Sequence, residues 1–226
     1  MKIDNVTSAK TYDDHSIEVA ITDPFDKTLL HTKRYTAIRG GLVWPTNQSP
    51  AYFCLLGQEF RPANSWERRI PVGQRVIIAE YASEDLSLCK FYQRMIDIAD
   101  QFLCSHFYVA IPEKRDDCGF LNDFSVLVSE SKSKIYLTNA FDVGDFLLGI
   151  ARIRRSVDNG ELTIPDDSLI QPQVQGITRE DLQNSPEEVF FAINALRHVL
   201  GSYYRQPPLK IVPFRRTVSS GSRWAS

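Results

Sequence analysis

Apolar positions alternate with other residues near the start of the chain. Ile17, Val19 and Ile21 are each separated by one residue, a spacing typical of a strand with one buried face. A proline stops this run, and residues 29–35 are predicted to return antiparallel to it. The sequence therefore predicts an N-terminal β-arm or subdomain over residues 1–45.

Further along the chain, four runs have the length and composition of strands. They cover residues 51–57, 75–81, 106–111 and 134–138. The first run is continuously apolar, which predicts a central strand that is buried on both faces of its sheet.

Apolar residues at helical spacing separate these strands. Five of them recur at intervals that place them on one helix face: Leu88, Tyr92, Met95, Ala99 and Phe102. Residues 120–128 are predicted as a second helix, although their pattern also suits a strand. Phe146, Ile150 and Ile153 begin a third helix, which Gly160 ends where a left-handed residue is needed.

The last predicted helix has the clearest start signals. A polar loop with Pro165, Pro172 and Gly176 precedes it. Ser185 is its predicted cap, and Glu188 completes a capping box. The predicted buried face consists of Val189, Ile193, Leu196, Leu200 and Tyr203.

This succession of strands and helices predicts an α/β fold in which helices flank a mixed sheet, over residues 46–206. Residues 207–226 are rich in Ser and Arg and are predicted to be a basic, disordered tail. The 226 residues suffice for one large domain with an appendage.

The composition is that of an ordinary globular protein. The chain is 43% apolar and its net charge is −2, so no overall field attracts it to nucleic acid or membrane. Its four cysteines lack CxxC spacing and are predicted to be free thiols in a reducing compartment. Since no signal peptide and no 18-residue apolar run occur, we expect a cytoplasmic protein without a membrane segment.

Carboxylates close to strand ends are the candidates for chemistry. Glu59 follows the strand at 51–57, Glu80 lies near the end of the next, and Glu113 follows the strand at 106–111. Ligands gather at the carboxyl ends of strands in open α/β sheets. Carboxylates that meet there can hold Mg²⁺ or Mn²⁺ for phosphodiester cleavage. The alternative is that these charged residues merely mark where strands reach solvent.

Motifs in the second half carry a resemblance to a known family. The segments GIARIR at 149–154 and GELTI at 160–164, followed by NALRH at 194–198, resemble the closing run of the C-terminal nuclease domain of phage terminase large subunits. The resemblance covers residues 52–205 and implies an RNase H-like fold. It also implies double-stranded DNA as a partner, with a phage motor or portal protein nearby.

That family uses an Asp on its first strand, an acid on a later strand and an Asp at its last helix. The resemblance implies Glu59, Glu113 and Glu188 as catalytic residues, with Glu80 and Glu187 as further metal ligands. Asn194 stands where the family has its last Asp.

Basic residues are the predicted contacts with the DNA backbone. They lie on the third helix and in the tail: Arg152, Arg154, Arg155, Lys210, Arg215 and Arg216. Three functions remain open at this point. The chain is a metal-dependent endonuclease, a catalytically inactive RNase H-like scaffold or DNA-binding module, or an oligomeric structural protein that binds no nucleic acid.

Overall fold

A computed structural model describes residues 6–13, 16–22, 30–45, 49–59, 74–83, 88–110, 119–131, 134–140, 146–178 and 190–204. The elements follow in the order β1 (Val6–Thr11), β2 (Ile17–Thr22), β3 (Leu30–Val43), β4 (Tyr52–Glu59), β5 (Arg75–Ala82), α1 (Leu88–Gln101), β6 (His106–Val109), α2 (Gly119–Ser131), β7 (Tyr136–Asn139), α3 (Phe146–Asp158), β8 (Leu162–Thr163), α4 (Ile170–Gly176) and α6 (Phe191–Tyr204). The predicted strands at 51–57, 75–81, 106–111 and 134–138 and the helices at 120–128 and 146–157 are thereby confirmed.

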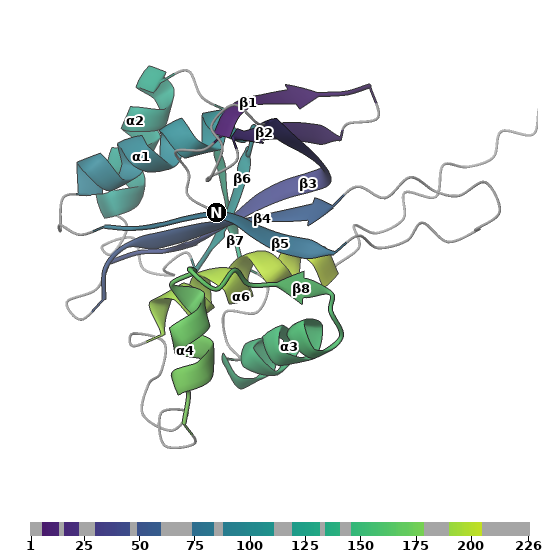
Figure 1. Ribbon diagram of the computed structural model, residues 1–226. Coiled ribbons are helices and arrows are strands. Elements are labelled where there is room, and N and C mark those ends of the chain that lie inside the picture. The colour runs from purple at the N-terminus through teal and green to yellow at the C-terminus, as the bar shows by residue number, and fades with distance from the viewer. Residues whose placement is uncertain are drawn as a thin grey trace, which may run out of the picture.

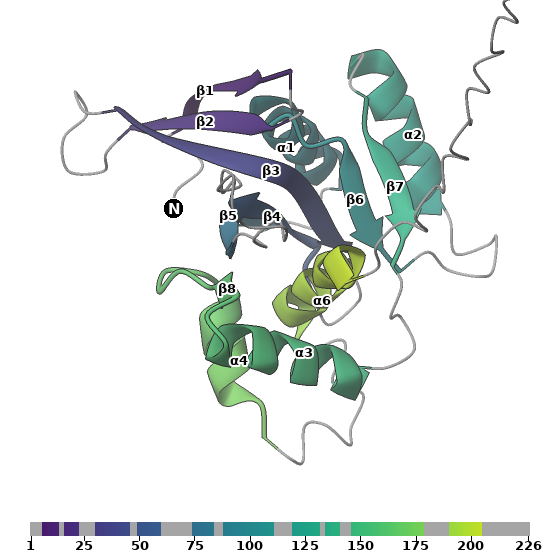
Figure 2. The same cartoon turned by 90° about the vertical axis from the view of Figure 1, so that its right-hand side faces the viewer.

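All the strands belong to one sheet, in which β3 is the central member. The order is β1-β2-β3-β4-β5-β8, and β6 and β7 continue the sheet from β3. β3 is long enough to pair with β2 along its first half and with β6 at Gly40, Gly41 and Leu42. Figure 2 shows this strand running from beside β2 down to α6.

Strand directions show that the sheet is mixed. β4 is antiparallel to both β3 and β5, whereas β6 is parallel to β3 and β7 is parallel to β6. The five strands β5-β4-β3-β6-β7, with α1 and α2 as the crossover helices, have the order and directions of an RNase H-like fold. The predicted fold class is confirmed.

Helices cover both faces of the sheet. α1 and α2 lie on one face, and α3, α4 and α6 lie on the other (Figure 1). β4 contributes Phe53 and Leu55 to the first layer and Tyr52, Cys54 and Leu56 to the second. Because every one of these side chains is fully buried, the prediction of a central strand covered on both sides is confirmed.

The sheet does not divide at residue 45. β2 pairs antiparallel with the first half of β3, as predicted for the runs at 17–21 and 29–35, and β1 adds a further antiparallel strand beside β2. β3, however, pairs with β4 from Tyr35 to Val43. The predicted arm thus includes the central strand of the main sheet, because β3 has neighbours on both of its sides.

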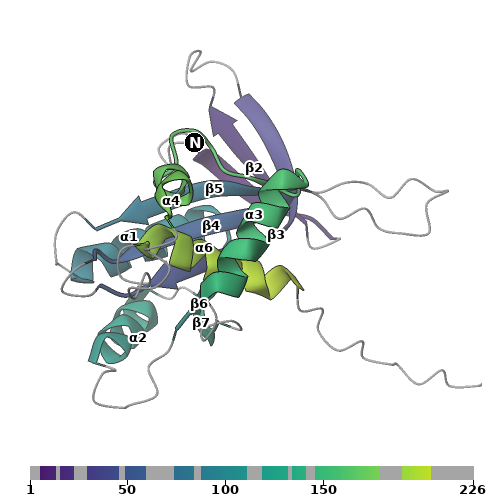
Figure 3. The same cartoon turned by 90° about the horizontal axis from the view of Figure 1, so that it is seen from below.

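The last helix, α6, begins later than its start signals predicted and is buried more completely. It starts at Phe191, and Ser185 and Glu188 lie outside the described residues. Every residue from Ala192 to Ser202 is buried. An amphipathic pattern was expected, but α6 lies between the sheet and the helices α3 and α4, as seen from below in Figure 3.

The loop predicted after β8 contains a short helix. Residues 170–176 form α4, although Pro172 and Gly176 are both poor helix residues. Pro172 lies in the first turn, where a backbone N–H has no intrahelical acceptor, so the proline removes no hydrogen bond. The loop prediction was wrong because it counted these residues as breakers wherever they occur.

Two chain reversals depend on residues with positive φ. Gly160 has a φ of 68° after α3, which confirms its predicted role at the helix end. Leu103 has a φ of 52° after α1. There the N–H of Cys104 donates to the carbonyl of Ala99, and the N–H of Leu103 donates to that of Asp100. These are the two bonds of a Schellman motif, in which glycine is the usual residue at the position of Leu103.

The cysteines of the described residues are free thiols. Cys54 and Cys104 are buried and Cys89 is exposed, while Cys118 lies outside the described residues. Burial raises the pKa of the Cys104 thiol to about 12, so this thiol stays protonated at neutral pH. No helix in the described part of the chain has both the length and the apolar run that crossing a membrane requires.

Candidate functional site

Strand pairing defines one edge of the sheet at which several chain segments meet. Val43 is paired with Tyr52, Tyr52 with Ala82, and Leu42 with Val109. The carboxyl ends of β3, β5 and β6 and the start of β4 therefore lie together. We call this the Tyr52 edge. An RNase H-like site for metal and substrate is expected here, where strands end beside the start of α6.

Glu59 lies at the opposite edge of the sheet. It is paired with Tyr35, near the beginning of β3, and its carboxylate is 3.9 Å from Lys33 Nζ. Tyr35 and Leu42 are seven residues apart on one strand, which corresponds to about 23 Å at the rise of a β-strand. The structure therefore does not bring Glu59 together with the end of β6. Grouping these carboxylates at one edge would require the strand at 51–57 to run parallel to the later strands, but β4 is antiparallel to its neighbours.

Glu113, Glu187 and Glu188 lie outside the described residues, and so do Lys210, Arg215 and Arg216. Two described segments are next to these glutamates in the sequence, β6 before Glu113 and α6 after Glu188, and each has one end at the Tyr52 edge. β6 ends there at Val109, and at the start of α6 the ring of Phe191 lies 5.5 Å from that of Tyr52. A shared location for the three glutamates remains a prediction.

Glu80 lies at the Tyr52 edge, but other groups occupy its carboxylate. Oε2 accepts hydrogen bonds from the hydroxyls of Tyr52, at 2.6 Å, and Ser168, at 3.0 Å. Oε1 accepts one from the backbone N–H of Leu169, at 2.8 Å. Leu169 immediately precedes α4, so this carboxylate satisfies a backbone N–H at the start of the helix and links α4 to β5. Burial, followed by the charges of Cys54 and Glu80, raises the pKa of Tyr52 well above its usual value.

A second side chain caps the next helix in the same way. The amide oxygen of Gln173, on α4, accepts hydrogen bonds from the N–H groups of Ala192 and Ile193 at 3.0 and 3.2 Å. These N–H groups belong to the first turn of α6, where a metal ligand or a phosphate would be expected to act. Sequence reasoning missed Gln173 because no local pattern links a glutamine in one helix to the start of another.

The positions at which the resembling family has its acids carry other residues here. β3, the first strand of the RNase H-like core, reads LHTKRYTAIRGGLV and contains no Asp or Glu. Asn194 is buried in the first turn of α6. A neutral amide supplies a weaker ligand than a carboxylate for a hard divalent cation.

The motifs that carried the resemblance pack against one another. A Cβ added to Gly149 would overlap the Cγ and Cδ of Arg197, and the guanidinium of Arg197 lies 5.2 Å from the ring centre of Phe146. Ile150, Leu162 and Leu196 belong to the same apolar cluster. The glycine of one motif therefore makes room for the arginine of the other, and both serve the contact between α3 and α6.

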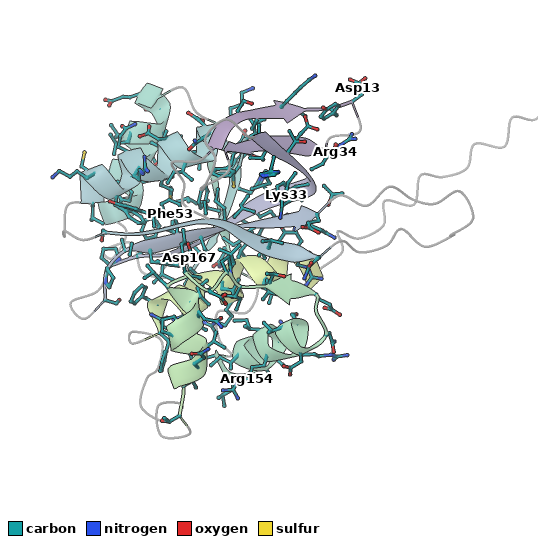
Figure 4. The ribbon with its side chains drawn as sticks, in the orientation of Figure 1. Asp13, Lys33, Arg34, Phe53, Arg154 and Asp167 are labelled. Atoms are coloured by element: carbon teal, nitrogen blue, oxygen red, sulfur yellow. The ribbon has the colours of Figure 1, made fainter. Side chains whose placement is uncertain are left out.

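The three predicted arginines of α3 differ in their surroundings. Arg154 and Arg155 are exposed, whereas Arg152 is partly buried and has an interaction within the chain. Figure 4 shows Arg154 pointing away from the body of the molecule. Leu147 and Leu148, which are 55% and 42% exposed, lie on the same outer side of α3. This surface therefore combines two cations with exposed apolar groups.

The described residues do not form a metal centre. They contain no group of three or more His, Cys, Asp or Glu side chains that could hold an ion. Of the predicted ligands, Glu80 is bonded to three groups of the chain and Glu59 is at the far edge. The two predicted ligands among the described residues, Glu59 and Glu80, do not by themselves fit two Mg²⁺ or Mn²⁺ ions, which need several carboxylates within reach of a pair of sites about 4 Å apart.

Comparison with known proteins gives distant structural likeness only. No family model and no curated protein matches the sequence. Two solved structures of the human cytomegalovirus terminase nuclease domain are similar in fold, both soaked with Mn and one with an inhibitor bound. The inhibitor-bound structure is 9% identical, with 74% of this chain and 81% of that chain covered at a TM-score of 0.39. The other is 11% identical, with 73% and 85% covered at the same TM-score.

Proposed function

We propose that this chain is a non-catalytic RNase H-like module that holds double-stranded DNA without cutting it. The observation that carries this proposal is the lack of any carboxylate on β3, the central strand at the Tyr52 edge. The engaged carboxylate of Glu80 and the amide of Asn194 support it. A phage packaging assembly with a motor or portal protein is the proposed setting.

The first test is cleavage. We expect purified protein to leave supercoiled plasmid intact in Mg²⁺ or Mn²⁺ at micromolar protein concentrations. We also expect Mn²⁺ to leave the melting temperature unchanged, because an ion that binds only the folded state would raise it. Nicking that follows the protein through purification would contradict the proposal.

The second test is DNA binding. Arg154 and Arg155 are the exposed cations of α3, and each phosphate contact contributes about 0.9 to the slope of log affinity against log salt. We expect the double variant Arg154→Glu/Arg155→Glu to bind duplex DNA more weakly, with a slope lower by about 1.8. The matched control Lys90→Glu/Lys134→Glu reverses two exposed charges, one on α1 and one just before β7, and should change neither quantity.

A metal-dependent endonuclease is the second candidate. It is favoured by one observation, that the described ends of β6 and α6 meet at the Tyr52 edge, next to the segments that contain Glu113 and Glu188. If nicking occurs, this candidate predicts its loss in Glu113→Gln and in Glu188→Gln. Glu59→Gln, at the opposite edge, should cleave like the unchanged protein.

A further inference from the structure

His198 lies at the contact between the last helix and the central strand. α6 crosses β3 at Gly41, where an added Cβ would overlap the carbonyl of Ala195. One turn further, Nδ1 of His198 is 3.1 Å from the carbonyl oxygen of Leu42, and the side chain is buried. Because a carbonyl only accepts, Nδ1 carries a proton, and the second protonation of this ring must occur at Nε2.

The groups around His198 offer no negative charge to an imidazolium. α6 itself contributes Arg197, which is buried beside it. The titratable or charged groups on the strands of this layer are Arg39 on β3, Tyr52 and Cys54 on β4, Arg75 and Glu80 on β5, and Tyr108 on β6, and α6 adds Tyr203. The carboxylate of Glu80 accepts hydrogen bonds from Tyr52, Ser168 and Leu169. Burial raises the pKa of both Tyr52 and Cys54, so these two groups are neutral at the pH at which a histidine titrates. α3 faces α6 with Phe146 and Gly149.

We infer that the contact between His198 and β3 is an acid-sensitive latch, in which protonation of the imidazole releases α6 from the sheet while the layer of α1 stays in place. The two layers are separate apolar clusters on opposite faces of the sheet. Release of α6 therefore exposes only one of them.

The direction of the pH effect follows from the pKa of the docked histidine. Burial lowers this pKa to about 4; the hydrogen bond to Leu42 opposes the shift, and the charge of Arg197 adds to it. In the released helix the pKa returns to its ordinary value of 6.5. The released form binds more protons between these values, so docking weakens as the pH falls from 6.5 to 4 and changes no further below that. The expected increase in opening between pH 7.5 and pH 5 is about 30-fold.

Hydrogen exchange on the full chain at these two pH values tests the latch. After correction for intrinsic exchange rates, amides of α6 should open about 30-fold more often at pH 5, and amides of α1 should change less than about threefold. Unchanged opening of α6, or an equal increase in α1, would overturn the inference.

Two variants identify the group responsible. His198→Asn keeps an N–H donor for Leu42 but does not titrate, and we expect its α6 to open equally at both pH values. His106→Asn removes an exposed histidine and should behave like the unchanged protein. An increase that persists in His198→Asn assigns the effect to another group and overturns the latch. If His198→Asn does not fold, the comparison of α6 with α1 in the unchanged protein decides alone.

Discussion

Leu103 and Gly160 share a left-handed backbone conformation but differ in what it costs. In this region the Cβ of a leucine lies close to the next carbonyl, at a cost of about 1 kcal/mol, whereas glycine has no Cβ. Leu103 is 42% exposed, so the packing of its buried atoms offsets only part of this backbone strain. At Gly160 no atom lies within 4 Å of where a Cβ would be placed, so backbone strain alone governs a substitution there.

Introducing a glycine at position 103 and removing the glycine at position 160 should change the free energy of unfolding in opposite directions. We expect Leu103→Gly to raise the free energy of unfolding by roughly 0.5–1 kcal/mol and Gly160→Ala to lower it by about 1 kcal/mol. Urea denaturation measures both. A loss of stability in Leu103→Gly would mean that the buried part of the leucine outweighs the backbone strain.

Glu80 distinguishes a structural carboxylate from a metal ligand. Glu80→Ala removes the acceptor of three hydrogen bonds and should lower the free energy of unfolding by about 3 kcal/mol in EDTA. Tyr52→Phe removes one of the three and should cost about 1 kcal/mol. If Glu80→Ala is as stable as the unchanged protein in EDTA but loses a stabilisation by Mn²⁺, Glu80 is a ligand instead.

The role of Glu80 was beyond the reach of sequence reasoning. Its position near a strand end was visible, and the prediction that it lies at the sheet edge is in keeping with the structure. Its partners Ser168 and Leu169, however, come from a segment far along the chain, and no local pattern links that segment to Glu80. A carboxylate that caps a helix and one that binds a metal have the same local sequence.

At the scale of elements, the backbones of α6 and β3 lie in close contact at Gly41. A Cβ at Gly41 would overlap the backbone carbonyl of Ala195, which cannot move without displacing the helix. We expect Gly41→Ala to lower the free energy of unfolding by about 3 kcal/mol, measured by thermal or urea unfolding. Gly176→Ala is the control, since nothing lies within 4 Å of its added Cβ, and it should be neutral or slightly stabilising.

Most elements were predictable because their periodicity is local. The apolar stripe from Leu88 to Phe102 predicts a helix, and the apolar run in β4 predicts a strand, from the residues of that segment alone. α4 was missed because Pro172 and Gly176 were counted as helix breakers. The start of α6 was not predictable, because the side chain that caps it, Gln173, comes from another element. Helix ends that depend on tertiary partners leave little trace in the residues around them.

At the scale of the molecule, the direction of β4 explains why Glu59 lies far from the other end of the sheet. The apolar run in β4 predicts a buried strand equally well in either direction, because burial on both faces removes any alternation. Only the pairing of Val43 with Tyr52 shows that the chain turns back after β3 and carries Glu59 away from the Tyr52 edge. The structure therefore separates Glu59 from the Tyr52 edge, while the grouping of Glu113, Glu187 and Glu188 stays a prediction.

The burial of α6 between the sheet and two helices also constrains how the protein is made on the ribosome. β3, β4 and β6 are all synthesised long before α6, yet one face of each depends on that helix for its cover. The nascent chain can cover one face of the sheet as soon as α1 and α2 have emerged. The opposite face stays uncovered until nearly all the described residues, including α6, have been synthesised. During that interval a chaperone has a defined apolar surface to hold, and a stalled or shortened chain would expose the same surface to aggregation.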